Sequence, residues 1–233
     1  MTAAPGAALG APVGRWAAAP AAAADLPPAP ADAARVLVVR HGETGWNAAG
    51  RHQGRADVPL NRRGREQARA LGWLLRALPV DAAYTSPLAR ARDTAELALA
   101  GRGVRAAGVE AFAELSYGAR AGERRVDWLA ADPAFVARWD REPWAVTFPG
   151  GESLADVHRR AAPAWDAVVR AHRGETVLVS AHGHLNRVLL LHALGLPREC
   201  FWAVPQPNAS CVVVDVGPCG ATAAVLAAAP PPA

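Results

Sequence analysis

The chain has 233 residues, a formal net charge of +4 at pH 7 and a hydrophobic content of 52%, which suits one large domain with a buried core. Its basic residues are dispersed among acidic ones, which argues against a nucleic-acid partner and favours small anionic ligands. No window reaches about 18 uninterrupted apolar residues, so we expect no membrane span and no membrane partner.

The two ends of the chain differ in composition from its centre. Residues 1–34 are rich in alanine, proline and glycine, and we expect a disordered tail rather than a signal peptide, because prolines and glycines interrupt the apolar segment. Residues 35–227 then form one domain, and 228–233 form a second short tail. The cysteines are three in number and lack metal-type spacing, which predicts a reducing, cytoplasmic location.

Strands and helices are predicted to alternate along the central domain. Short apolar, β-branched runs indicate buried strands, and apolar residues at helical spacing indicate helices between them. Alternation of this kind predicts an α/β fold, a three-layer α/β/α sandwich around a mostly parallel sheet. The expected strands cover residues 36–39, 81–85, 104–109, 176–179, 212–216 and 221–226, and the expected helices cover 61–78, 86–100, 153–173 and 185–194. Ser86 is the predicted cap of the second helix, with Pro87 in its first turn.

Two of the predicted strands end in histidine and glycine. Val39 is followed by Arg40-His41-Gly42, and Val179 leads within three residues to His182-Gly183-His184. Ligands of parallel α/β sheets bind beyond the carboxyl ends of the strands, so we expect the two histidines to meet at one sheet edge. The start of the helix after Ser86, with Arg90 and Arg92, adds positive charge. This combination predicts a concave anion-binding site.

Less specific interpretations of these histidines remain open. A single histidine after a strand is often a hydrogen-bonded structural residue, although two such strand ends make this interpretation weaker. His182 and His184 could also bind a metal, but no cysteine or carboxylate pattern completes such a site. We therefore expect neither a metal nor another cofactor.

Six blocks in the chain resemble the signature of the histidine phosphatase superfamily, which contains the cofactor-dependent phosphoglycerate mutases and many phosphatases. They occur in family order and span about Arg35 to Val216. The blocks are Arg40-His41-Gly42-Glu43-Thr44 with Trp46-Asn47, Gly64 with Gln67-Ala68, Ser86-Pro87-Leu88 with Arg90-Ala91, Glu114-Leu115 with Tyr117-Gly118, Pro149-Gly150-Gly151-Glu152-Ser153, and His182-Gly183.

The resemblance implies a phosphoglycerate mutase-like fold and a small phosphorylated substrate. It implies that His41 is the nucleophile, attacking phosphorus through one ring nitrogen while a backbone carbonyl holds the other. Arg40, Arg90 and His182 would surround the phosphate oxygens, with Asn47 and Gly183 as further phosphate-binding residues. The resemblance also allows a homodimer.

Glu114 matches the proton donor of the family. It would protonate the leaving alkoxide and then accept a proton from the water that hydrolyses phosphohistidine. For the first role we expect a raised pKa, caused by partial burial or by the neighbouring phosphate. Taken alone, Glu114 could be an ordinary surface carboxylate. Glu43 is the competing candidate acid because it lies close to His41 in sequence, although that position suits the orientation of neighbouring groups better.

Hydrolysis of a phosphomonoester is the function that we expect. Mutases of the family usually carry His-Tyr-Gly followed by Leu-Gln-Gly after the acid, whereas residues 116–122 read Ser-Tyr-Gly-Ala-Arg-Ala-Gly. Mutase-type phosphoryl transfer is the enzymatic alternative, and a non-catalytic relative that binds phosphorylated ligands is another. His184 replaces a residue that is often small and is expected to narrow or repolarise the pocket. The natural substrate is not predicted, but residues 118–149 are expected to cap the pocket.

Overall fold

The computed structural model describes residues 15–16, 23 and 26–226 of the chain. The predicted tail at 228–233 and most of the predicted tail at 1–34 lie outside these residues. In the described part of the N-terminal tail, the short strand β1 (Arg15–Trp16) pairs in parallel with β7 (Gly220–Leu226), the last strand in chain order. Strand β2 begins at Ala34, one residue before the predicted start of the domain.

The described residues form a seven-stranded sheet in the order β1-β7-β6-β2-β5-β3-β4. Strands β2, β5, β3 and β4 run parallel to one another, whereas β6 is antiparallel to both β2 and β7. The sheet is therefore mostly parallel, as predicted. The strand bounds are β2 (Ala34–Arg40), β3 (Ala82–Thr85), β4 (Ala106–Gly108), β5 (Thr176–Ala181), β6 (Cys211–Gly217) and β7 (Gly220–Leu226).

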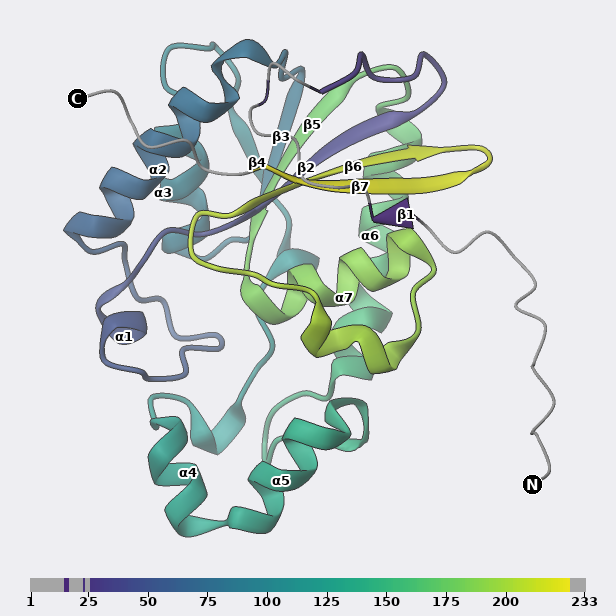
Figure 1. Ribbon diagram of the computed structural model, residues 1–233. Helices are drawn as coiled ribbons and strands as arrows, with labels where there is room; N and C mark the ends of the chain where they lie inside the picture. The colour runs from purple at the N-terminus through teal and green to yellow at the C-terminus, as the bar shows by residue number, and fades with distance from the viewer. Residues whose placement is uncertain (1–14, 17–22, 24–25, 227–233) are drawn as a thin grey trace, which may run out of the picture.

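Helices cover both faces of the sheet, which confirms the three-layer α/β/α sandwich (Figure 1). Side chains alternate between the faces of a strand, so Val36 and Val38 of β2 pack with helices α6 (Leu154–Ala171) and α7 (Gly183–Leu194). The intervening Leu37 and Val39 pack on the other face with α2 (Arg62–Leu74) and α3 (Ala89–Ala98). The central strand is thus apolar on both sides because it is buried on both sides.

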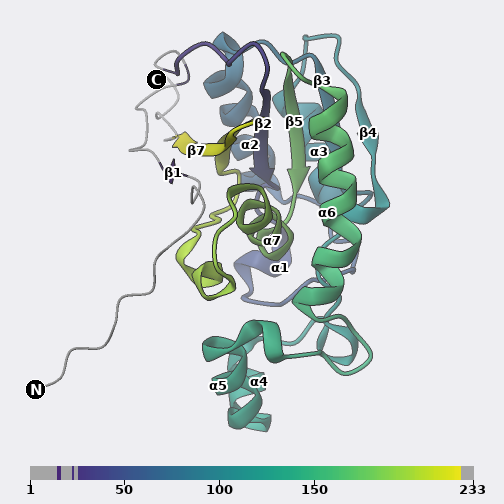
Figure 2. The same ribbon diagram turned by 90° about the vertical axis from the view of Figure 1, so that its right-hand side faces the viewer.

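A small helical cap lies beyond the carboxyl ends of β2 and β5 (Figure 2). It contains α4 (Arg125–Ala131) and α5 (Pro133–Arg141), whose buried Trp128 and Trp139 pack with the same apolar cluster as α6 and α7. The short α1 (Gly45–Ala48) follows β2 at the same end. The remaining elements are 3₁₀ turns, at Leu75–Ala77, Glu110–Phe112, Gly118–Arg120, Pro143–Ala145 and Arg198–Ala203. In the described part of the chain, no helix combines the length and apolarity that crossing a bilayer requires.

The predicted start of α3 is wrong. The helix begins at Ala89, with Leu88 in the capping position, and Ser86 and Pro87 precede it in an irregular segment. The Ser86 hydroxyl does not cap the helix: it is hydrogen-bonded to Nε2 of His182, 2.7 Å away, and accepts from the backbone N–H of Leu88 at 3.2 Å. Helix α7, by contrast, begins earlier than predicted, at Gly183 rather than two residues later.

Candidate active site

The two strand-end histidines meet at one edge of the sheet. Strands β2 and β5 are adjacent and parallel with Arg40 opposite Ala181, and the backbone N–H of His41 donates to the carbonyl of Ala181. The rings of His41 and His182 lie edge to face with centroids 5.2 Å apart. Parallel pairing therefore joins residues that are 141 positions apart in the sequence.

His41 is neutral and has one fixed tautomer. Its Nδ1 lies 2.7 Å from the carbonyl oxygen of Gly42, and because a carbonyl can only accept, Nδ1 carries the proton and Nε2 carries a lone pair. Burial lowers the pKa of His41 well below its ordinary value, and the charges of Arg90 and Arg40 lower it further. The ring is therefore neutral at neutral pH, and its Nε2 lone pair is free to react.

Arg90 is a fully buried cation beside this ring. Its terminal nitrogens donate to the carbonyls of Ala56 at 2.7 Å and Gly54 at 2.8 Å, which fixes the guanidinium on the loop after α1. Burial lowers the pKa of Arg90 to about 10, so that the group keeps its charge at neutral pH. Its Nε has no hydrogen-bond partner among the described residues.

Arg40 and His182 also present buried nitrogens that lack a partner. Arg40 donates to the backbone carbonyl of Gln206, while its Nε is unpaired within the described part of the chain, as is Nδ1 of His182. Buried polar groups are nearly always hydrogen-bonded, so a cluster of unpaired ones around a cavity indicates a ligand that satisfies them. Guanidinium groups favour a phosphate or carboxylate. The arrangement is that of an anion-binding site.

Glu114 lies at the N-terminus of α7 as an ionised carboxylate. Its Oε1 accepts from the backbone N–H groups of Leu115 and Leu185 at 2.9 and 3.1 Å, and its Oε2 accepts from that of His184 at 3.2 Å. Burial raises the pKa of Glu114, but hydrogen bonds and the charges of His184 and His182 outweigh it, so that the pKa lies well below its ordinary value. The expectation of a pKa raised by burial is therefore wrong, whereas the effect of a neighbouring phosphate stays a prediction.

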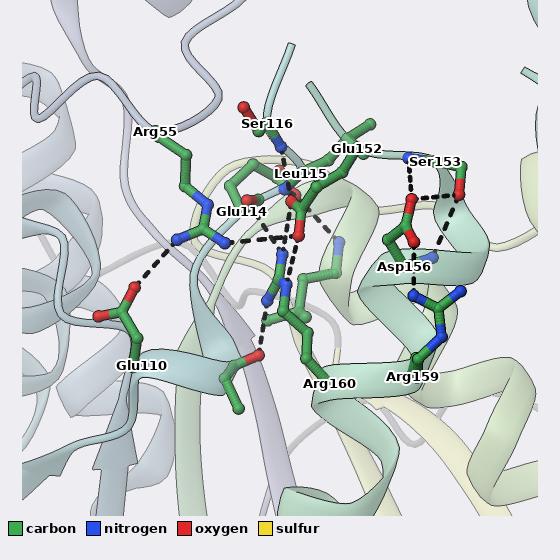
Figure 3. A network of polar contacts seen from close by, with 12 residues as sticks. Arg55, Glu110, Glu114, Leu115, Ser116, Glu152, Ser153, Asp156, Arg159 and Arg160 are labelled. Atoms are coloured by element: carbon green, nitrogen blue, oxygen red, sulfur yellow. Dashed lines mark hydrogen bonds and ion pairs between the residues drawn. The ribbon is translucent and has the colours of Figure 1, made fainter. Parts of the chain in front are cut away.

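An ion-pair network holds the segment that carries Glu114 (Figure 3). Arg160 of α6 donates to the backbone carbonyl of Glu114 at 3.2 Å and forms an ion pair with Glu152 at 2.8 Å. The other carboxylate oxygen of Glu152 accepts from the N–H of Ser116 at 2.9 Å, and Arg55 joins Glu152 to Glu110. Glu152, which follows Gly150 and Gly151, thus fixes the segment that carries Glu114.

Of the remaining predicted residues, His182 is fully buried and is not among those that line the pocket, whereas Asn47 and Gly183 are. Both line a cavity of about 290 Å³ together with Arg40, His41 and Arg90. The Asn47 side-chain oxygen accepts from the backbone N–H of Thr44 at 3.1 Å, which orients the amide within a capping box. A Cβ on Gly183 would lie 3.5 Å from Nε of Arg40, so the glycine keeps space open beside that guanidinium.

Arg92 and Glu43, two further candidates from the sequence, lie away from the anion site. Arg92 is exposed on α3, 3.8 Å from the neighbouring Asp93 carboxylate, and does not contribute to the anion site. Glu43 accepts from the side-chain amide of Asn61 at 2.8 Å, in the capping region of α2, and is not among the residues that line the cavity. Glu114 is therefore the carboxylate that the structure places at the site.

The structure adds residues to which the sequence analysis assigned no role. Arg187, Tyr117 and His52 line the cavity, and Asn208 donates to the backbone carbonyl of His41 at 3.1 Å. Arg187 could have been found, because it follows Gly183 by four residues and so lies on the same face of α7. Asn208 follows no pattern in the sequence, since it reaches the site from the loop before β6 only through the antiparallel pairing of that strand with β2.

The described residues contain no group of three or more histidine, cysteine or acidic side chains placed to hold a metal ion. His182 and His184, the pair considered as ligands, have other partners. Nε2 of His182 bonds to the Ser86 hydroxyl at 2.7 Å, and Nδ1 of His184 lies 3.1 Å from the Tyr117 hydroxyl.

Comparison with known proteins agrees with this geometry. The profile of the histidine phosphatase superfamily (branch 1) matches residues 36–228. Phosphoserine phosphatase 1 of Hydrogenobacter thermophilus is 33% identical over 182 residues, covering 78% of this chain and 86% of that protein. A 2,3-bisphosphoglycerate-dependent phosphoglycerate mutase of Gloeobacter violaceus is 36% identical over 171 residues, covering 71% of this chain and 78% of that protein. The solved structure of a mycobacterial glucosyl-3-phosphoglycerate phosphatase in complex with VO3 has a TM-score of 0.77 and 28% identity, covering 84% of this chain and 99% of that one. The chain belongs to the histidine phosphatase superfamily.

Proposed function

We propose that this hydrolase of the histidine phosphatase superfamily cleaves phosphomonoesters of small metabolites through a phosphohistidine on His41. The observation that carries the proposal is the state of His41, which is neutral, fixed in one tautomer and adjacent to unpaired nitrogens of Arg40, Arg90 and His182. A neutral imidazole is the nucleophilic form. Donors placed around the phosphoryl oxygens stabilise the charge that spreads over them in the transition state.

The first step transfers the phosphoryl group to the enzyme. Nε2 of His41 forms a bond to phosphorus while the bond from phosphorus to the ester oxygen breaks, and Glu114 supplies the proton that the leaving oxygen takes. Arg40, Arg90 and His182 bind the phosphoryl oxygens during this transfer, and the Asn47 amide and Gly183 contact the same group. The carbonyl of Gly42 stabilises the ring as it gains positive charge, because it accepts from the opposite nitrogen.

The second step returns His41 to its starting state. A water molecule attacks phosphorus and loses a proton to the Glu114 carboxylate while the bond from phosphorus to Nε2 breaks, releasing inorganic phosphate. The carboxylate is already ionised before substrate binds, which suits this role as a base. Uncatalysed phosphomonoester hydrolysis is so slow that the site supplies a barrier reduction on the order of 20 kcal/mol.

Mutase-type transfer to a second hydroxyl is the alternative, and the phosphoglycerate mutase relative favours it. Incubation with 2,3-bisphosphoglycerate and 3-phosphoglycerate separates the two reactions. We expect release of inorganic phosphate. Rapid formation of 2-phosphoglycerate with little free phosphate would instead identify a mutase.

Phosphate release from p-nitrophenyl phosphate between pH 5 and 8, with EDTA present, tests the proposal itself. We expect turnover by the wild type and none by His41→Ala, which retains the surrounding cations but lacks the nucleophile. An inactive wild type would favour a non-catalytic phospho-ligand-binding protein, and sensitivity to EDTA would indicate a metal.

We further propose a cytoplasmic location, which the free thiols of Cys200, Cys211 and Cys219 support. A homodimer and the lack of nucleic-acid and membrane partners stay predictions from the sequence.

A further inference from the structure

A second cavity adjoins the active pocket. It has a volume of about 470 Å³ and shares His52, Arg125, His184 and Arg187 with the pocket that contains His41. Its other walls come from Trp139 and Asp140 of α5 and from Trp202, in the 3₁₀ turn after α7. This volume lies within the range of roughly 300–1,000 Å³ that is usual for small-molecule sites.

The leaving group of a bound phosphomonoester would enter this second cavity. Glu114, the group proposed to protonate the leaving oxygen, has its Oε2 3.7 Å from Nδ1 of His184. The His184 ring is a wall shared by both cavities. The leaving oxygen therefore lies on the side of the active pocket that opens into the second cavity.

Arg187 brings a positive charge to the boundary between the two cavities. It donates to the backbone carbonyls of Val204 at 2.9 Å and Gly183 at 3.3 Å, and it has no ion pair with any carboxylate in the described part of the chain. Burial lowers its pKa and the nearby charge of Arg40 lowers it further, whereas the charge of Glu114 raises it. Arg125, the other arginine shared by the cavities, differs because it forms an ion pair with Asp140.

Arg187 also lies close to the phosphate-binding side of the site. The position that a Gly183 Cβ would occupy is 3.7 Å from Nη1 of Arg187 and 3.5 Å from Nε of Arg40. The space beside Gly183 is thus bounded by two guanidinium groups. A single phosphoryl group held by Arg40 and Arg90 leaves the charge of Arg187 available to a second anionic group on the same ligand.

An aromatic wall faces the same space. Trp202 is 39% exposed although it is large and apolar, and its ring centroid lies 5.4 Å from the guanidinium carbon of Arg187. It meets the rings of Trp139 and His184 at 87° and 84°, which holds it in place. A carbon skeleton between the two anionic groups of a ligand could pack against this ring.

We propose that Arg187 is a specificity-determining residue that binds a second anionic group, carboxylate or phosphate, on the alcohol portion of the substrate. The preferred substrates are then phosphomonoesters of hydroxy acids or of phosphorylated alcohols, rather than phosphomonoesters of neutral alcohols. This inference rests on the proposed function for the identity of the first anion.

Matched substrates test the inference. 3-Phosphoglycerate and glycerol 3-phosphate differ in one place, where a carboxylate replaces a hydroxymethyl group, and fructose 1,6-bisphosphate and fructose 6-phosphate provide the corresponding phosphate comparison. We expect kcat/KM of the wild type to favour the doubly anionic member of at least one pair by about 10- to 100-fold, the usual effect of a charge-assisted hydrogen bond. The pair that shows the preference identifies the second anion.

Arg187 variants assign that preference to one side chain. In Arg187→Gln we expect the ratio of the two kcat/KM values to fall close to one, and in Arg187→Lys to take an intermediate value because the charge is retained. Arg141→Gln is the matched control, since Arg141 is exposed on α5 and pairs with Glu142, and its ratio should equal that of the wild type. Because each ratio compares two substrates of one variant, a general loss of active protein cancels.

Calorimetric binding to His41→Ala separates this inference from the proposed function. We expect tighter binding of the doubly anionic member in this background and loss of the difference when Arg187→Gln is added. If the wild type hydrolyses nothing but this preference holds, the proposed function fails and the second-anion site stands. A wild-type ratio near one in both pairs, or an unchanged ratio in Arg187→Gln, would overturn the second-anion site.

Discussion

Replacing Glu114 by glutamine tests its proposed role as proton donor. The hydrogen bonds of Glu114 indicate how much stability this substitution should cost. The amide oxygen of glutamine can keep the two N–H donors that now reach Oε1, from Leu115 and Leu185. The amide NH₂ then faces the N–H of His184, which loses its acceptor at 3.2 Å. One buried unsatisfied donor costs about 1–3 kcal/mol, which corresponds to a fall in Tm of about 2–4 °C per kcal/mol for a chain of this size. Glu114→Gln should therefore fold.

The kinetic effect should depend on the leaving group. Loss of a general acid typically slows a reaction by about 10²- to 10⁴-fold, and we expect a loss of that size in kcat/KM for alkyl phosphates, whose alkoxides need the proton. p-Nitrophenolate is stable without a proton, so for p-nitrophenyl phosphate the loss should be less than about tenfold.

Steady-state kinetics with both substrates check this expectation. Glu110→Gln is the matched control, because Glu110 lies on the same segment but is exposed and only pairs with Arg55. Equal losses for the two substrates in Glu114→Gln would refute the reasoning, since a residue that only shapes the pocket does not distinguish leaving groups.

Three further predictions concern backbone contact and pH. Gly64→Ala would place a Cβ 2.0 Å from a backbone carbonyl oxygen of the loop after His41, and we expect about 1–3 kcal/mol of destabilisation and reduced activity, measured by thermal melts against Gly45→Ala, which meets nothing within 4 Å. Because burial and neighbouring cations keep the pKa of His41 well below its ordinary value, activity should show no acid limb near pH 6.5. An acid limb near pH 6.5 that is caused by protonation of His41 would contradict the assignment of His41 as a neutral nucleophile. His184→Gly keeps the backbone donor to Glu114 but removes the ring that lowers the pKa of that carboxyl, so the alkaline limb for alkyl phosphates should move to higher pH.

The meeting of the two histidines was predictable from the sequence because it depends on local patterns. Each of two apolar runs ends in histidine and glycine, and parallel pairing places the carboxyl ends of neighbouring strands together. The only additional information needed is that β2 and β5 are neighbours. The three-layer architecture follows from the same alternation of strands and helices, and the structure confirms it.

The ionisation of Glu114 was not predictable in this way. Two of its three backbone donors, His184 and Leu185, are about 70 positions away and point at the carboxylate because α7 begins at Gly183. The family resemblance gives a role for Glu114, but the pKa depends on which N–H groups surround it in three dimensions. For the same reason the sequence could not show that the Ser86 hydroxyl bonds to His182 rather than capping α3.

A carboxyl group with a lowered pKa can still act as an acid if the proton arrives with the substrate. In the free protein the site holds neutral His41, ionised Glu114 and two buried guanidinium groups. A phosphomonoester in its monoanionic form carries one acidic proton. Once the ester is bound, its negative charge raises the pKa of the adjacent Glu114, so the proton can move to the carboxylate and then to the leaving oxygen. When the leaving alcohol departs, Glu114 is again ionised and accepts the proton of the attacking water. Hydrogen bonds that hold Glu114 as a base in the free protein are therefore compatible with its acid role in the complex.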